Sequence, residues 1–162
     1  MTSDAPEDPA VFVSRIESLA TRTLVPRGAG SMLWRAWGEG RPLLLVHGAS
    51  GSWTHWIRNI LPLAAEFRVL VPDTPGFGDS ATPPEPHTAD GLAELVASGL
   101  DAVVPAPTAL DVAGFSFGGI IGGLVAARLG RRIRTLVLLG AGGMALGRAP
   151  TRPLVRIPPL TP

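Results

Sequence analysis

The sequence predicts an α/β fold, a mainly parallel sheet with helices on both faces. Short apolar runs such as "LLLV" and "VLV" are typical of strands buried on both sides. They alternate with longer segments of helical periodicity, which is the pattern of βαβ units. With 162 residues, 46% of them hydrophobic and 17% charged, the chain is long enough for one domain with a core and too short for two.

The first forty residues predict a helix and two strands. After a loose tail at residues 1–8, Phe12, Ile16 and Leu19 recur at helical spacing. Residues 21–37 read as two short strands joined by a turn at residues 27–30, and a second turn follows at residues 38–40. We expect these two strands to form the antiparallel edge of the sheet.

The next hundred residues alternate between strands and helices. Thr88 or Asp90 is the expected cap of a helix that runs to about Val104, and Pro62 interrupts an earlier helical pattern. Beyond Gly140 there are five prolines and no periodicity, so this end is predicted to be irregular. The predicted order is the strand "RPLLLVHG", the helix "SWTHWIRNILPLAAEF", the strand "RVLVPD", the helix up to Val104, the strand "TALDVAG", the helix "FGGIIGGLVAARLG" and the strand "IRTLVLLG".

Composition and charge exclude several classes of site and partner. The formal net charge of +1 indicates no polyanionic partner, and the arginines near the C-terminus lack the aromatic neighbours of a nucleic-acid site. Without cysteine, disulfides and thiolate metal sites are excluded. The start "MTSDAPEDPA" is acidic and unlike a signal peptide, so we expect a cytoplasmic location. The longest uncharged run, residues 112–127, is shorter than the ~20 residues of a membrane span, which favours a buried strand, turn and helix.

A glycine-flanked serine is the main chemical feature. The segment "GFSFG" fits the pattern G-x-S-x-G and places Ser116 between Gly114 and Gly118, where an apolar strand turns into a helix. Small residues two positions before and after the serine permit a strained turn that exposes its hydroxyl. The helix that begins at Phe117 also points N–H groups at the site, where they can stabilise negative charge.

Two upstream loops make this motif more specific. The strand "LLLV" ends in "HGAS", which leaves the backbone N–H of Ala49 at the carboxyl edge of the sheet. Together with the N–H of Phe117, it is the expected oxyanion hole. The side chain of His47 is expected to be structural. The turn "DTPGFGDS" follows the next strand, and its carboxylates, Asp73 and Asp79, are expected to cap backbone N–H groups rather than bind a metal.

In the order "VHGAS", "DTPGFGDS" and "GFSFGG", the chain resembles the N-terminal half of an alpha/beta-hydrolase over about residues 21–145. The resemblance implies a serine nucleophile, Ser116, with oxyanion donors at Ala49 and Phe117. It implies hydrolysis of an ester-like or carbon–carbon bond in a small-molecule substrate through an acyl-enzyme, with no cofactor and no metal. A serine nucleophile makes a haloalkane dehalogenase or an epoxide hydrolase a weaker match.

The family's triad acid and histidine follow the serine along the chain. Here no Asp, Glu or His follows Asp111, and the three histidines lie upstream of Ser116. His55 and His87 are expected to line a pocket or the surface. We therefore expect a C-terminally truncated chain, in which residues 133–139 form an uncovered apolar edge strand, and catalytic inactivity of the isolated chain is the alternative reading.

The expected organisation is a tail and helix at residues 1–20, a partial hydrolase core at 21–145, and an irregular tail at 146–162 that begins a missing lid. A weaker alternative is a dinucleotide-binding module, because residues 140–145 fit G-x-G-x-x-A after a strand. That fingerprint requires a following helix and a later acidic residue, whereas Pro150 and Pro153 follow here and no acid does. No nucleic-acid or membrane partner is expected, and the oligomeric state is left open.

Overall fold

A computed structural model describes residues 7–27 and 30–142. Its order of elements matches the sequence prediction from the first helix to the last strand. The helices are α1 (Pro9–Ser18), α2 (Ile57–Ala64), α3 (Ala89–Val103) and α4 (Phe117–Leu129), with 3₁₀ turns η1 (Trp53–Trp56) and η2 (Gly130–Arg132). The strands are β1 (Thr21–Arg27), β2 (Gly30–Trp37), β3 (Arg41–Val46), β4 (Phe67–Pro72), β5 (Leu110–Phe115) and β6 (Ile133–Leu139).

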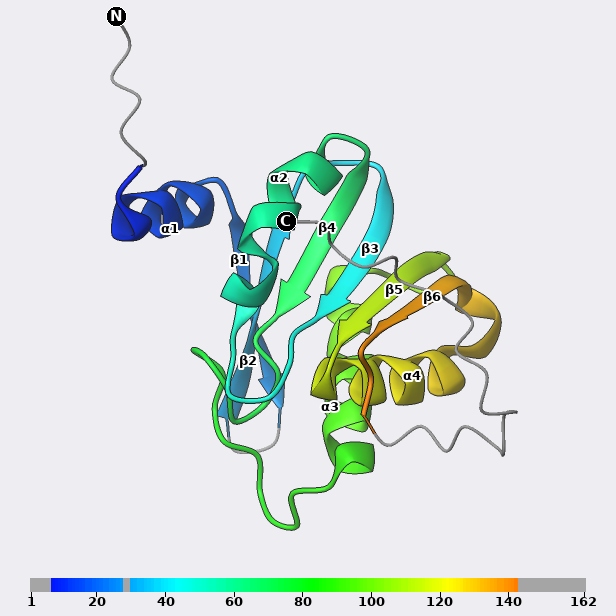
Figure 1. The fold of residues 1–162 in the computed structure, drawn as a ribbon. Coiled ribbons are helices and arrows are strands. Elements are labelled where there is room, and N and C mark those ends of the chain that lie inside the picture. The colour runs from blue at the N-terminus through cyan, green and yellow to red at the C-terminus, as the bar shows by residue number, and fades with distance from the viewer. Residues whose placement is uncertain (1–6, 28–29, 143–162) are drawn as a thin grey trace, which may run out of the picture.

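The six strands form one mixed sheet in the order β1-β2-β4-β3-β5-β6 (Figure 1). β1 pairs with β2 and β2 with β4 in antiparallel fashion, whereas β4, β3, β5 and β6 are parallel neighbours. This arrangement confirms the predicted α/β class and the antiparallel edge built from the first two strands. Since β3 and β5 are adjacent and parallel, their carboxyl ends, and the loops that follow them, lie side by side.

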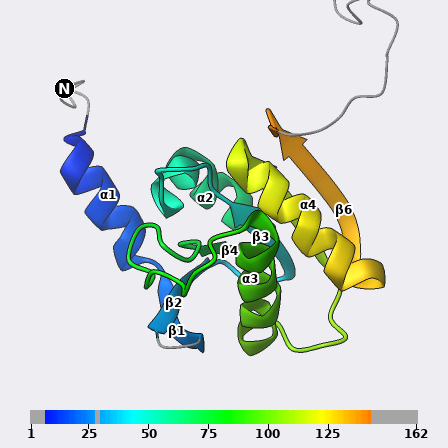
Figure 2. The same cartoon turned by 90° about the horizontal axis from the view of Figure 1, so that it is seen from below.

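Helices cover both faces of the sheet and create two separate apolar cores (Figure 2). On one face, α3 and α4 pack over strand residues such as Leu44, Val46 and Val112. On the other face, α1, η1 and α2 pack over Leu43, Leu45 and neighbouring residues. The inner strand β3 contributes to both cores, and five of its six residues are buried, as its continuous apolar run predicts.

Local signals explain most helix ends. Asp8 caps α1 by accepting from the N–H groups of Ala10 and Val11, and Thr88 rather than Asp90 caps α3. The predicted interruption at Pro62 differs from the structure, because α2 continues through this residue to Ala64. Proline removes one backbone donor, but only two helical residues follow it, and the fully buried Ile60 packs the helix onto the sheet. The change in geometry lies earlier, where η1 passes into α2.

β6 is the last described strand and pairs only with β5 within the described part of the chain. Its side chains Leu136, Val137 and Leu139 are 40–44% exposed, in agreement with the predicted uncovered edge. Of the G-x-G-x-x-A pattern, residues 143–145 lie outside the described residues, as does the expected tail at residues 146–162. Among the described helices, none combines the length and the apolar character needed to span a bilayer.

Candidate active site

Ser116 lies in a strained turn between β5 and α4. Its backbone has φ 55° and ψ −121°, a region that residues other than glycine rarely occupy. The turn is held from both sides, because the Ser116 N–H donates to the Leu139 carbonyl at 2.8 Å and the Ser116 carbonyl accepts from Gly119 N–H at 2.9 Å. The residue is partly exposed. Strain of this type costs about 1–3 kcal/mol and is typical of functional sites.

The glycines around Ser116 are required by close backbone approach. A Cβ atom on Gly114 would overlap the backbone of Gly118, and one on Gly118 would overlap the carbonyl oxygens of Val46 and His47. A Cβ atom on Gly119 would meet Ala141, just after β6. The G-x-S-x-G-G segment therefore packs directly against the ends of β3 and β6, as the spacing of the motif requires.

The loop after β3 lies directly against Ser116. Val46 pairs with Gly114 across the two strands, and a Cβ atom built on Gly48 would lie 3.4 Å from Cβ of Ser116. Ala49 is the next residue in this loop, and Phe117 is the first residue of α4, whose N–H has no intrahelical acceptor. The structure thus brings the three predicted site residues to the same edge of the sheet.

His47 is structural, as the sequence predicts. It is 1% exposed, and its Nε2 accepts from the N–H of Thr74 at 3.0 Å. Its Nδ1 lies 2.8 Å from the Gly48 carbonyl and therefore carries the ring proton. Burial lowers the pKa of His47, against the opposing effects of the Gly48 carbonyl and of Asp73. The imidazole is therefore neutral, with both of its nitrogens in use.

His55, from η1, is bound to the same loop. Its Nδ1 accepts from the N–H of Gly48 at 3.2 Å, which requires this nitrogen to be unprotonated. The ring also stands edge-on to Phe115, with centroids 5.8 Å apart, and faces Gly51, where a Cβ atom would overlap the imidazole. Sequence reasoning assigned this residue to a pocket or surface and did not predict the bond to Gly48.

His87 lies in the proline-rich loop before α3. Its Nε2 lies 2.8 Å from the Pro83 carbonyl and its Nδ1 lies 3.6 Å from a carboxylate oxygen of Glu85. The side chain lines a cavity of about 290 Å³, together with Phe77 and Phe117, next to the turn that carries Ser116. None of the three histidines hydrogen-bonds to the Ser116 hydroxyl within the described residues. Both nitrogens of His47, Nδ1 of His55 and Nε2 of His87 have other partners.

A buried ion cluster centred on Arg35 supports the loop after β4. Arg35 is 1% exposed and its guanidinium donates to Asp73 at 2.7 Å, to Glu17 at 2.8 Å and to Asp79. Burial acts against the charge, but the hydrogen bonds that Arg35 donates to the three carboxylates outweigh it and raise the pKa of Arg35. Asp73 also accepts from the N–H groups of Trp53 and Asp79, at 2.8 and 3.1 Å, so the predicted capping role is confirmed for this carboxylate.

Arg35 itself was not predicted as part of this cluster. The signal in the sequence is its position in "LWRAW", where alternation places it on the same face of β2 as the buried Leu33 and Trp37. A buried arginine at such a position requires carboxylate partners. Among the described residues, no group of three histidine or acidic side chains is arranged to hold a metal ion.

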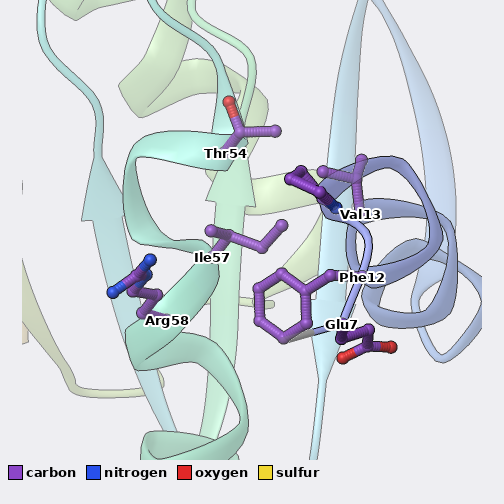
Figure 3. Close-up of a pocket in the computed structure, with 7 residues that line it drawn as sticks. Glu7, Phe12, Val13, Thr54, Ile57 and Arg58 are labelled. Atoms are coloured by element: carbon purple, nitrogen blue, oxygen red, sulfur yellow. The ribbon is translucent and has the colours of Figure 1, made fainter. Parts of the chain in front are cut away.

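A larger cavity, of about 590 Å³, lies away from Ser116, between α1 and η1–α2 (Figure 3). Phe12 and Val13 face Ile57 across it, with Glu7 and Arg58 toward its ends. Neither Ser116 nor any residue of the loop after β3 lines this cavity. Its size alone does not make it the reaction site.

The chain is similar in sequence to known bacterial proteins over about two thirds of its length. The chain is 39% identical over 105 residues to the dihydrolipoyllysine-residue acetyltransferase component of an acetoin cleaving system from Pseudomonas putida. It is 36% identical over 113 residues to 2-hydroxy-6-oxo-2,4-heptadienoate hydrolase from Pseudomonas putida. These matches cover 65% and 67% of this chain but only 28% and 40% of the two relatives.

Solved structures agree at the level of the fold. The chain is similar to a bacterial membrane phospholipase A with a TM-score of 0.74 and 28% identity, over 89% of this chain and 46% of that one. A family model described as the alpha/beta hydrolase fold matches residues 41–157. The chain therefore belongs to the alpha/beta hydrolase fold family and spans less than half the length of these relatives.

Proposed function

We propose that this chain carries the nucleophile and oxyanion half of a serine hydrolase, with Ser116 as the attacking residue. The observation that carries the proposal is the positive φ of Ser116 in a turn that only glycine neighbours permit. Backbone strain at this position fits a side chain that must be presented at the surface of the turn.

In the proposed reaction, Oγ of Ser116 attacks the carbonyl carbon beside the scissile bond and passes its proton to a base. The N–H groups of Ala49 and Phe117 stabilise the oxyanion that forms, and the N-terminal end of α4 adds favourable partial charge. Collapse of the intermediate breaks the scissile bond, the base protonates the leaving group, and water then hydrolyses the acyl-enzyme.

The base and its orienting acid are proposed to come from outside the printed sequence. No Asp, Glu or His follows Asp111, both nitrogens of His47 are bonded to backbone groups of Gly48 and Thr74, and Nδ1 of His55 accepts from Gly48. The alternative, that the isolated chain is catalytically inactive, rests on the same observation. Both readings keep Ser116 as the nucleophile and differ in whether a base and an acid from outside this chain complete the site.

The proposed substrate is a small carbonyl compound with an ester-like bond or a carbon–carbon bond to be cleaved. One relative is named as the hydrolase of an oxo-dienoate, and a structural neighbour is a phospholipase. The cavity of about 290 Å³ beside Phe117 is the proposed site for the part of the substrate next to the scissile bond. Its aromatic and proline lining favours an apolar group there.

Chemical rescue by imidazole tests this proposal. The experiment measures covalent labelling of the chain by a fluorophosphonate as the imidazole concentration rises, with Ser116→Ala as the control for reaction elsewhere. We expect slow labelling of Ser116 that imidazole accelerates, because it supplies a base that the chain lacks. Ester turnover by the chain alone should not exceed the ~10³- to 10⁴-fold acceleration that an oxyanion hole and binding provide without a triad. Equal labelling of the wild type and Ser116→Ala would exclude Ser116 as the nucleophile. Ordinary hydrolase turnover without imidazole would contradict the claim that the chain lacks a base.

A further inference from the structure

We propose that His55 is a positioning residue that fixes the orientation of the Ala49 N–H by holding the backbone of Gly48. This inference rests on the proposed function, because it assigns the Ala49 N–H to the oxyanion hole. It adds a residue that lies outside the nucleophile motif and that makes no hydrogen bond to Ser116 within the described residues. Its partner in this role is His47, which is bound to the other polar group of the same glycine.

Gly48 is held by two imidazoles, one on each of its backbone polar groups. Its N–H donates to Nδ1 of His55 at 3.2 Å, and its carbonyl accepts from Nδ1 of His47 at 2.8 Å. The Gly48 carbonyl and the Ala49 N–H belong to one trans peptide plane, in which they point in opposite directions. Because the Gly48 carbonyl is directed at His47, the Ala49 N–H points away from that ring. The hydrogen bond from the Gly48 N–H to His55 limits rotation of the preceding peptide, between His47 and Gly48.

The ring of His55 is itself held in place by three neighbours. It stands edge-on to Phe115, the residue before Ser116, at 5.8 Å between centroids and 87° between planes. It stands edge-on to His47 at 6.1 Å and 81°, and Gly51 leaves the space that its ring occupies. A side chain at residue 51 would displace the imidazole. His55 is an exposed residue whose ring contacts the loop after β3 and the last residue of β5, close to the proposed oxyanion donors.

Two opposite tautomers follow from these bonds. His55 must have Nδ1 unprotonated and therefore carries its proton on Nε2, whereas His47 carries its proton on Nδ1 and accepts at Nε2. This tautomer also prevents His55 from acting as the base for Ser116 while it holds Gly48. The hydrogen bond to Gly48 thus assigns His55 to positioning and occupies the nitrogen that it would otherwise use as a base.

The test compares two substitutions that separate the acceptor from the ring. His55→Asn retains an acceptor, since its amide oxygen can take the place of Nδ1, whereas His55→Phe retains a planar ring and removes the acceptor. We expect His55→Phe to increase hydrogen exchange of the Gly48 amide by about two- to tenfold, the range that one hydrogen bond supports. We expect His55→Asn to leave it close to the wild-type value.

A second readout follows the proposed chemistry. Imidazole-assisted labelling of Ser116 by a fluorophosphonate should fall by about tenfold or more in His55→Phe, because a misdirected oxyanion donor loses part of the 10²- to 10³-fold effect of such a group. His55→Asn should restore it. Far-ultraviolet circular dichroism checks that both variants fold. Equal Gly48 exchange and equal labelling in His55→Phe and the wild type would overturn the proposal.

Nitrogen NMR of the wild-type chain keeps the proposal testable if a variant does not fold. The expected spectrum at neutral pH has a pyridine-like Nδ1 for His55 and a pyridine-like Nε2 for His47. A protonated Nδ1 in neutral His55 would refute the bond to Gly48. If wild-type Ser116 is not labelled at all, the proposed function fails by itself, while the exchange and NMR measurements still decide the role of His55.

Discussion

At the scale of single residues, the site depends on where the chain can tolerate a Cβ atom. Gly118 and Gly123 lie on the same helix, α4, but a Cβ atom at Gly118 would overlap the backbone of β3, whereas nothing lies within 4 Å of one at Gly123. The serine motif was predictable from the sequence because its five residues are contiguous and each glycine has a local steric reason.

These two glycines provide a matched pair of substitutions. Gly118→Ala is expected to lower the free energy of unfolding by about 1–3 kcal/mol, since β3 or α4 must shift to admit the methyl group. Gly123→Ala is expected to raise it by about 0.5–1 kcal/mol, because alanine is the better helix former in an open position. Urea unfolding followed by circular dichroism measures both. Similar changes in the two variants would contradict the close approach of α4 to β3.

The contacts of His55 and Arg35 were not predictable at this scale. Both residues act on partners far along the chain or outside their own element, Gly48 for His55 and Asp73 for Arg35. Strand and helix periodicity indicates which face a residue occupies, but not which loop lies opposite it. The sequence alone therefore located the turn at Ser116 and the loop after β3, but not the contacts of His55 with the loop after β3 or of Arg35 with the loop after β4.

At the scale of elements, the inner strands β3, β4 and β5 were predictable because each contains a short apolar run bounded by turn residues. The difference at Pro62 has a tertiary cause, since packing of Ile60 stabilises α2 beyond what local preference indicates. The Arg35 cluster shows the same dependence on tertiary contacts. It joins α1 through Glu17, β2 through Arg35 itself and the loop after β4 through Asp73.

Two arginines that share the partner Glu17 test this connection. Arg35→Met is expected to cost about 3–5 kcal/mol of unfolding free energy, because it leaves the fully buried carboxylate of Asp73 without its cation. Arg22 lies 3.9 Å from Glu17 with its side chain 55% exposed, and Arg22→Met is expected to cost about 0–1 kcal/mol. Thermal and urea unfolding compare the two variants. An equal, small loss in both would mean that the cluster does not stabilise the fold.

At the scale of the whole molecule, the described sheet has two edges that differ in character. The outer strand β1 carries Pro26 and two arginines, features that discourage pairing with another chain. The outer strand β6 contains one arginine, Arg134, followed by an apolar run that is largely exposed. Within the described residues, association is therefore favoured at β6 and disfavoured at β1.

A lysine at each edge tests which one drives association. Val137 in β6 is 42% exposed and Leu24 in β1 is 64% exposed. If exposed apolar surface alone decided association, Leu24 would therefore contribute more than Val137. We expect the wild-type chain to associate as its concentration rises, and Val137→Lys to reduce this, because a charge on an edge strand opposes pairing. Leu24→Lys should leave association unchanged. Sedimentation velocity over a range of concentrations measures the effect, with circular dichroism as the control for folding. A reduction by Leu24→Lys alone would show that exposed apolar area, and not the unprotected edge of β6, governs how this chain associates.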